Sequence, residues 1–135
     1  MKRILFTLLL GLSLVISACG PAKPATTINV SLTDFQFQPG DFTIPAGKEI
    51  TLNATNTGAV VHNFVIMKLG MDVGGFYDDD DAPNVYWEVE VLPGGKANVT
   101  FTAPSEPGTY QVICRTEGHI ASGMTGVLTV VADDS

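Results

Sequence analysis

Residues 49–56 read EITLNATN, and this stretch indicates the class of fold. Its apolar residues Ile50, Leu52 and Ala54 alternate with polar ones, which is the pattern of a β-strand with one buried face. The segment 127–130, VLTV, alternates in the same way. Both stretches predict strands rather than helices.

The chain on either side of this expected strand contains further short runs that are typical of strands. Runs of about four to eight residues rich in Val, Ile, Thr and Phe are separated by turns rich in Gly, Pro and Asn. We therefore expect an all-β fold, a two-sheet antiparallel Greek-key sandwich of about eight strands. The expected strands are Ile28–Leu32, Phe42–Ile44, Glu49–Asn56, Val60–Met67, Tyr86–Leu92, Ala97–Thr102, Gly108–Cys114 and Gly126–Val131.

The composition excludes several classes of protein. A chain of 135 residues predicts one domain, with or without a short appendage. Fourteen acidic residues against seven basic ones give a net charge of −7, which argues against a nucleic-acid partner. Two His cannot build a multi-copper oxidase cluster or a three-His zinc site.

The N-terminal segment 1–18 has the features of a signal peptide. A positively charged start precedes the uncharged, mostly apolar run 4–16, which is too short to span a bilayer as a helix. The small residues before Cys19 resemble a bacterial lipobox, so we expect lipidation at Cys19. An ordinary signal peptide with an incidental Cys is the alternative. Residues 19–27 then comprise the lipidated Cys19 and a flexible tether, and 28–135 form the folded domain.

Removal of residues 1–18 changes the net charge of the chain, and the folded domain then contains one cysteine. It leaves five basic residues against fourteen acidic ones, a charge of −9. Cys114 becomes the single thiol of the folded domain, which is unusual in an oxidising compartment. A Cys19–Cys114 disulfide is the alternative, and lipidation of Cys19 would exclude it.

One connection, residues 68–85, is unusually long and contains four successive acids, Asp78, Asp79, Asp80 and Asp81. Long loops in compact domains are often functional. Three interpretations remain open: a solvated excursion, a docking patch for a basic partner, or a weak calcium site.

Cys114, His119 and Met124 follow the spacing Cys-x4-His-x4-Met near the C-terminus, and His62 lies in an expected strand. One thiolate, two imidazoles and a thioether are the ligands of a blue copper site. Each residue alone has an ordinary alternative: a buried thiol, a core or turn histidine, or a core methionine. Their joint occurrence favours copper.

Residues 28–131 resemble the cupredoxins, most strongly over 60–66 and 110–130. The Cys-x4-His-x4-Met spacing looks most like that of the auracyanins. The resemblance implies one copper ion with His62, Cys114 and His119 in a trigonal plane and Met124 as the axial ligand. It also implies that Asn63 tethers the cysteine loop while its N–H donates to the Cys114 sulfur.

The chain departs from the family pattern at one position near the site, and the resemblance also implies an electron-transfer surface. Relatives commonly have Thr or a small hydroxyl residue directly after the cysteine, where this chain has Arg115, and a cation there would raise the reduction potential. We expect electrons to pass at the solvent-facing edge of His119. Small or apolar residues expected around that edge are Gly58, Ala59, Ile120, Ala121 and Ser122.

These features predict a membrane-tethered one-electron carrier rather than an enzyme. Its expected partners are membrane or periplasmic redox proteins, with no nucleic acid and no small-molecule substrate. We expect it in the bacterial cell envelope, lipid-anchored on the outer face of the plasma membrane or in the periplasm. The alternative is a copper carrier or assembly protein that delivers the ion, and a binding module without metal is a third class.

Overall fold

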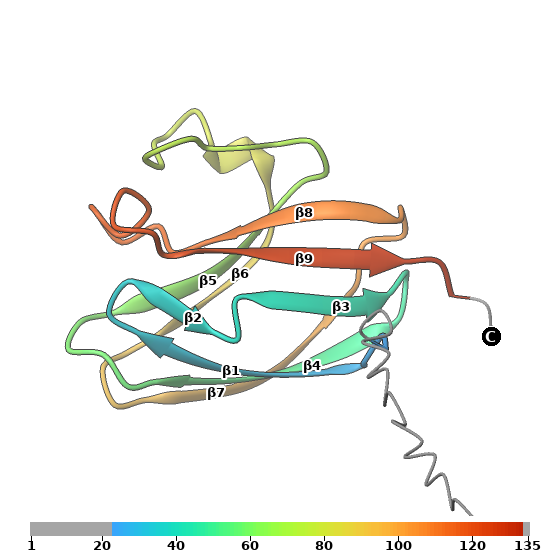
Figure 1. The fold of residues 1–135 in the computed structure, drawn as a ribbon, viewed down its shortest axis with the longest axis horizontal. Coiled ribbons are helices and arrows are strands. Elements are labelled where there is room, and N and C mark those ends of the chain that lie inside the picture. Colours follow the sequence, from blue (N-terminus) through green and yellow to red (C-terminus); the bar gives the residue numbers. More distant parts are fainter. Residues whose placement is uncertain (1–22, 134–135) are drawn as a thin grey trace, which may run out of the picture.

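The computed structural model describes residues 23–133, which form nine strands and one short 3-10 helix, η1 (Ala82–Asn84) (Figure 1). The strands are β1 (Thr27–Thr33), β2 (Gln36–Gln38), β3 (Asp41–Pro45), β4 (Glu49–Asn56), β5 (His62–Met67), β6 (Val85–Val91), β7 (Lys96–Thr102), β8 (Gly108–Ile113) and β9 (Thr125–Val131). The predicted signal segment 1–18 and Cys19 lie outside the described residues. Within 23–133 the longest helix is a single short turn, and none could cross a membrane.

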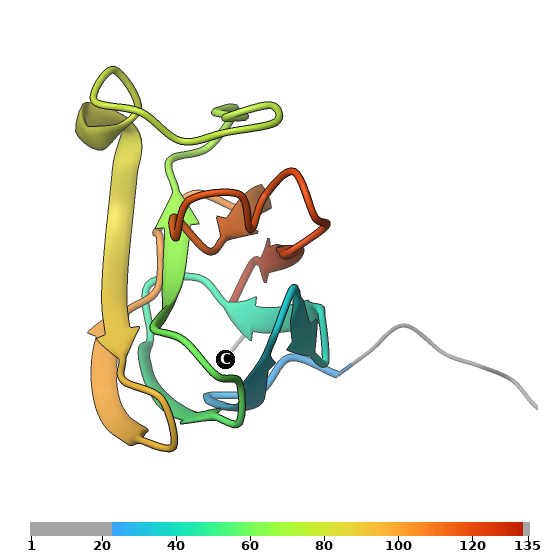
Figure 2. The same cartoon turned by 90° about the vertical axis from the view of Figure 1, so that its left-hand side faces the viewer.

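The strands pack as a two-layer sandwich, seen from one end in Figure 2. One sheet has the strand order β2-β1-β4-β7, and the other has the order β3-β9-β8-β5-β6. The predicted all-β, two-sheet sandwich is confirmed. Two pairs, β1 with β4 and β3 with β9, run parallel, so the pairing is mixed rather than purely antiparallel. Neither pair is joined by a hairpin, the connection that makes neighbouring strands antiparallel.

The main core lies between the two sheets. In β4 every second residue is buried, including Ile50, Leu52 and Ala54, as the alternation predicted. The opposite sheet contributes Phe64, which is fully buried in β5. Phe37 of the short strand β2 packs edge-on against Phe64, with ring centroids 5.6 Å apart. Burial of these apolar surfaces is the main driving force for folding.

A second, smaller cluster lies on the outer face of β5. Val65, Met67, Ile113 and Ile120 are buried there, and Val73, Tyr77 and Val85 pack against them. Consequently β5 is buried along its whole length and does not alternate. The long loop after β5 therefore contributes to this core, and only part of it is the solvated excursion of the first interpretation.

The end of the predicted tether already belongs to the folded domain. The backbone N–H of Ala25 donates to the carbonyl of Thr43 at 3.0 Å. The carbonyl of Thr26 accepts from the N–H of Thr51 at 2.9 Å. Strand β1 follows directly at Thr27.

Candidate metal centre

Three side chains from distant parts of the sequence converge at one end of the sandwich. His62 is the first residue of β5, Cys114 directly follows β8, and His119 lies in the loop between β8 and β9. The antiparallel register aligns Val65 with Ile113. This pairing places the start of β5 beside the end of β8, so that His62 meets Cys114 from 52 positions away.

The donor atoms are close enough to share one ion. Cys114 Sγ lies 3.7 Å from His62 Nδ1 and 3.5 Å from His119 Nδ1. Metal bonds of about 2.3 Å to thiolate and 2.0 Å to imidazole, the values for zinc, would separate sulfur from nitrogen by about 3.7 Å in a trigonal plane. The three donor atoms lie within 4.8 Å of one another, and among the described residues they form the one such group of His, Cys, Asp and Glu side chains.

The cluster is shielded from solvent. His62 and Cys114 are fully buried, and His119 is 6% exposed. Cys114 is a free thiol in the described part of the chain. A buried thiolate between two imidazoles is a donor set that suits copper, zinc or iron, and one thiolate with two imidazoles is the set that favours copper electron-transfer sites.

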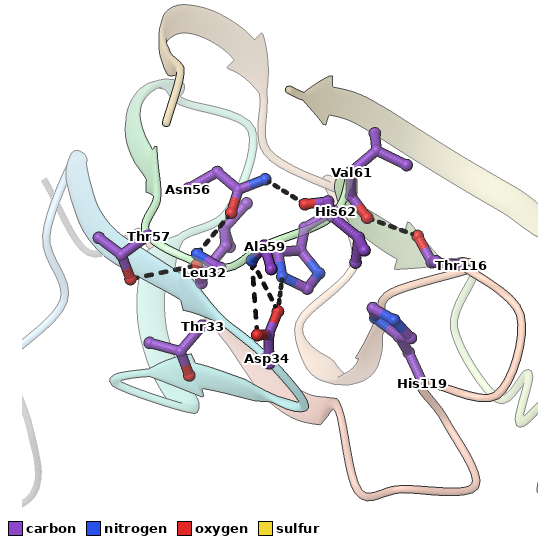
Figure 3. A network of polar contacts seen from close by, with 12 residues as sticks. Leu32, Thr33, Asp34, Asn56, Thr57, Ala59, Val61, His62, Thr116 and His119 are labelled. Carbon is purple, nitrogen blue, oxygen red and sulfur yellow. Dashed lines mark hydrogen bonds and ion pairs between the residues drawn. The ribbon is translucent and has the colours of Figure 1, made fainter. Parts of the chain in front are cut away.

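Hydrogen bonds around the cluster join the start of β5 to the loop that follows β8. The backbone N–H of Asn63 donates to Cys114 Sγ at 3.4 Å. The hydroxyl of Thr116 donates to the carbonyl of Val61 at 2.9 Å (Figure 3). The same hydroxyl lies 3.3 Å from Oδ1 of Asn63. Thr116 supplies a hydroxyl one position later than the resemblance led us to expect, so the cysteine loop is tied to β5 despite Arg115.

The chain matches the model of the cupredoxin-like domain over residues 6–130. This protein belongs to the cupredoxin-like family. Its buried His-Cys-His site is consistent with one copper ion. The expected family and cofactor class are thereby confirmed.

Known relatives of this cupredoxin include plant and bacterial proteins. Chloroplastic plastocyanin of Hordeum vulgare is 34% identical over 98 residues, which is 70% of this chain and 54% of the plastocyanin. The chain therefore spans about half the length of that relative. The dithionite-reduced auracyanin of Roseiflexus castenholzii has a TM-score of 0.68 at 34% identity, covering 81% of this chain and 99% of that one. Auracyanin A of Chloroflexus aurantiacus, a "blue" copper protein, has a TM-score of 0.63 at 28% identity and covers 81% and 100%.

Met124 lies at the end of the same loop. Its backbone N–H donates to the carbonyl of His119 at 2.9 Å, and its carbonyl accepts from Cys114 at 3.3 Å. The side chain is fully buried in the core that also contains Cys114. Backbone pairing thus places the fourth expected ligand beside two of the other three.

Arg115 forms an ion pair at the edge of the site. Its Nε lies 3.1 Å from Glu88 of β6, and both side chains are more than a third exposed. The neighbouring Glu90 accepts from the side-chain amide of Asn63 at 3.3 Å. A carboxylate therefore offsets the cation that the sequence places directly after Cys114.

The β1–β2 turn contacts both histidines, which the sequence reasoning missed. Asp34 Oδ1 lies 3.3 Å from His62 Nε2, as Figure 3 shows. Phe35 has a positive φ of 68° and packs edge-on against His119 with ring centroids 5.2 Å apart. No local signal in this turn points to metal chemistry, because the contacts depend on how the strands pack.

His119 is held in a form that can bind metal. Burial lowers the pKa of its imidazole, and the nearby His62 lowers this pKa further, while Asp34 opposes both effects. At neutral pH the ring is therefore uncharged and offers a lone pair, which is the form that ligates metals.

The surface around His119 differs in part from the expectation. Ala59, Ala121 and Ser122 are exposed, but Ile120 is only 7% exposed and belongs to the second core cluster. Phe35, which packs against His119, is 45% exposed and supplies apolar surface there instead. The acids Asp78–Asp81 lie on the long loop, where Asp78 and Asp81 accept local backbone N–H groups. Within 23–133 these acids are not part of the group of potential metal ligands that the structure brings together.

Proposed function

We propose that this cupredoxin is a one-electron carrier whose copper ion is held by His62, Cys114, His119 and Met124. The observation that carries the proposal is the fully buried Cys114 thiol, with an imidazole Nδ1 at 3.7 Å on one side and at 3.5 Å on the other. Copper bound to these residues supplies a reversible Cu(II)/Cu(I) couple.

The residues around the donor atoms would hold those atoms in one arrangement when copper is bound. The register of β5 with β8 places His62 beside Cys114, and Thr116 ties the loop to Val61 just before β5 and to Asn63 within it. A ligand frame that does not rearrange keeps the cost of electron exchange low. His119 lies at the surface end of the cluster against the exposed Phe35, which supports this edge as the place where electrons enter and leave.

An electron carrier is favoured over an enzyme by the donor set. Three buried donors with Met124 as the fourth ligand leave no position for a substrate, whereas catalytic metal sites keep one open. The partners that suit such a carrier are larger redox proteins, with no small-molecule substrate.

Copper delivery is the alternative function. A delivery protein needs exposed, exchangeable ligands, and here His62 and Cys114 are fully buried while His119 is nearly so. These burial values favour retention of the ion. Transfer of copper to a chelator within minutes would favour delivery instead.

The visible spectrum of the copper-loaded domain tests the proposal. We expect an intense thiolate-to-copper charge-transfer band after addition of Cu(II), bleached by ascorbate and restored by an oxidant. Cys114→Ser should abolish the band, whereas the matched change Ser105→Ala, at an exposed position of the loop between β7 and β8, should leave it unchanged. A colourless wild-type protein, or a band that survives Cys114→Ser, contradicts the proposal.

We further propose that residues 1–18 direct export and that a lipid on Cys19 anchors the carrier to the bacterial cell envelope. The lipobox-like residues before Cys19 support this proposal. Incorporation of labelled fatty acid into the full chain, and its loss in Cys19→Ala, is the expected result. A wild-type chain recovered without label contradicts it.

The acidic segment Asp78–Asp81 is proposed as a docking patch for a basic redox partner. Three of these side chains are exposed and the fourth is half-buried. Electron transfer to a basic partner should slow as salt rises, because exposed charges are screened. Replacement of Asp78 and Asp79 by Asn should weaken that salt dependence, and an unchanged dependence contradicts the docking role.

A further inference from the structure

Asp34 contacts the ring nitrogen of His62 that faces away from the cysteine. His62 Nδ1 faces Cys114 Sγ at 3.7 Å, and Nε2 faces Asp34 Oδ1 at 3.3 Å. When Nδ1 serves as the metal donor, the proton must lie on Nε2, which then donates to the carboxylate. A second hydrogen bond of this kind fixes the tautomer and orientation of a metal-binding histidine.

The carboxylate of Asp34 is itself held in place. The backbone N–H of Ala59 donates to Oδ1 at 3.1 Å and lies 3.4 Å from Oδ2. Asn56 donates its side-chain amide to the carbonyl of Val60 and shapes the same loop. In Figure 3, Asp34 points between Ala59 and His62. The β1–β2 turn and the β4–β5 loop are thus joined through one side chain.

Gly58 provides independent support for this contact. A Cβ atom at this position would collide with Asp34 Oδ1 and with His62 Nε2 at the same time. The site has room for the two polar atoms only because residue 58 has no side chain. The sequence therefore accommodates the carboxylate–histidine pair at a position where most residues would break it.

The charges make the contact relevant to redox chemistry. The side chain of His62 is fully buried, whereas that of Asp34 is 45% exposed. A carboxylate on the far side of a ligand ring makes the imidazole a stronger donor. This effect stabilises the more highly charged ion more than the less charged one.

We propose that Asp34 is a positioning residue for His62 and that its carboxylate shifts the copper equilibrium towards Cu(II). This inference rests on the proposed copper-carrier function. Asp34→Asn keeps an oxygen that can accept from both donors but removes the charge, whereas Asp34→Ala removes both. Glu49→Gln is the matched control: it removes one exposed negative charge at the first residue of β4, at the opposite end of that strand from the site.

The reduction potential is the first measurement. We expect Asp34→Asn to lower the preference for Cu(II) over Cu(I) about tenfold, a rise of about 59 mV for a one-electron couple. Gly58→Ala should shift the potential in the same direction, and Glu49→Gln should leave it unchanged. A shift in Asp34→Asn no larger than that in Glu49→Gln overturns the redox role. A wild-type protein without the charge-transfer band contradicts the carrier function instead, so the two failures are distinguishable.

Nitrogen NMR of the metal-free protein tests the positioning role without copper. We expect His62 to carry its proton on Nε2 in the wild type and in Asp34→Asn, and to lose this preference in Asp34→Ala. Thermal unfolding of each variant shows whether the fold is retained. A wild-type His62 protonated on Nδ1, or a tautomer unchanged in a folded Asp34→Ala, overturns the positioning role.

Discussion

The backbone N–H of Asn63 donates to Cys114 Sγ at 3.4 Å, and this hydrogen bond joins β5 to the residue that follows β8. The side chain of Asn63 adds two further contacts, because it donates to Glu90 of β6 and its Oδ1 lies 3.3 Å from the Thr116 hydroxyl. The residue that follows His62 therefore contacts the cysteine loop twice and β6 once.

Thr116→Val should destabilise the protein. The change removes the donor to the Val61 carbonyl and to Asn63 Oδ1, and a lost hydrogen bond at a part-buried site costs about 1–2 kcal/mol of unfolding free energy. Urea unfolding of the metal-free protein measures the loss. Thr109→Val, at an exposed position of β8, is the control and should stay within about 0.5 kcal/mol of the wild type. Equal losses in both variants would show that the hydroxyl of Thr116 contributes no more than a surface one.

Phe64→Ala should be among the most damaging core changes. Phe64 is fully buried and contacts Phe37 and Phe42 edge-on at centroid distances of 5.6 Å and 5.4 Å. Truncation of such a side chain costs about 3–5 kcal/mol of unfolding free energy. Phe76→Ala, at a position 68% exposed, should cost little in the same denaturation assay. Similar midpoints for the two variants would contradict the assigned core.

Arg115 and Glu88 should shift the reduction potential in opposite directions. Loss of the cation in Arg115→Gln should lower the potential, and loss of its partner in Glu88→Gln should raise it. Because both side chains are more than a third exposed, each shift should stay below the 59 mV of a tenfold change in the Cu(II)/Cu(I) equilibrium. The double variant should return near the wild type. Voltammetry at low and high salt checks this, and shifts of the same sign would refute the compensation.

Titration of the Tyr110 phenol should lower the free energy of unfolding as the pH rises into the alkaline range. Burial raises the pKa of its phenol, and the charge of Glu106 and the nearby Tyr86 raise it further. Above a pH of about 10 the unfolded chain releases this proton while the folded chain retains it. The stabilisation is therefore complete below that pH and is lost as the pH rises through the folded-state pKa. The phenol also donates to the carbonyl of Glu106 at 2.6 Å.

Urea unfolding at several pH values tests this alkaline effect. We expect Tyr110→Phe to lose the hydrogen bond at every pH. Its free energy of unfolding should fall less steeply in alkali than that of the wild type. A partial decline should remain, since burial also raises the pKa of Tyr86. An alkaline decline identical to that of the wild type would contradict the assignment to Tyr110.

The strands differ in how well local pattern predicts them. Glu49–Asn56 was predicted to the residue, because Ile50, Leu52 and Ala54 alternate with polar residues along the segment. Strand β2, Gln36–Gln38, was missed, since three residues are too short to show a period. The parallel pairing of β1 with β4 was also missed, because alternation specifies which face is buried but not which neighbour a strand chooses.

The candidate ligands were predictable, but most of their supports were not. Cys114, His119 and Met124 share one loop, so their spacing is visible in the sequence. Asp34 and Thr116 are single polar residues in turns, and such residues usually face solvent. Their contacts with His62 and Val61 depend on partners 28 and 55 positions away.

The sequence by itself determined the class of fold, the candidate donors and the excess of negative charge, because these depend on residue types and on spacing within single segments. Only the tertiary structure decided what surrounds the donors. Sheet register brings His62 to Cys114, and the packing of two separate turns places Asp34 on His62 and Phe35 on His119. Contacts between residues so far apart in the chain are selected by the burial of the whole core, and no local pattern specifies them.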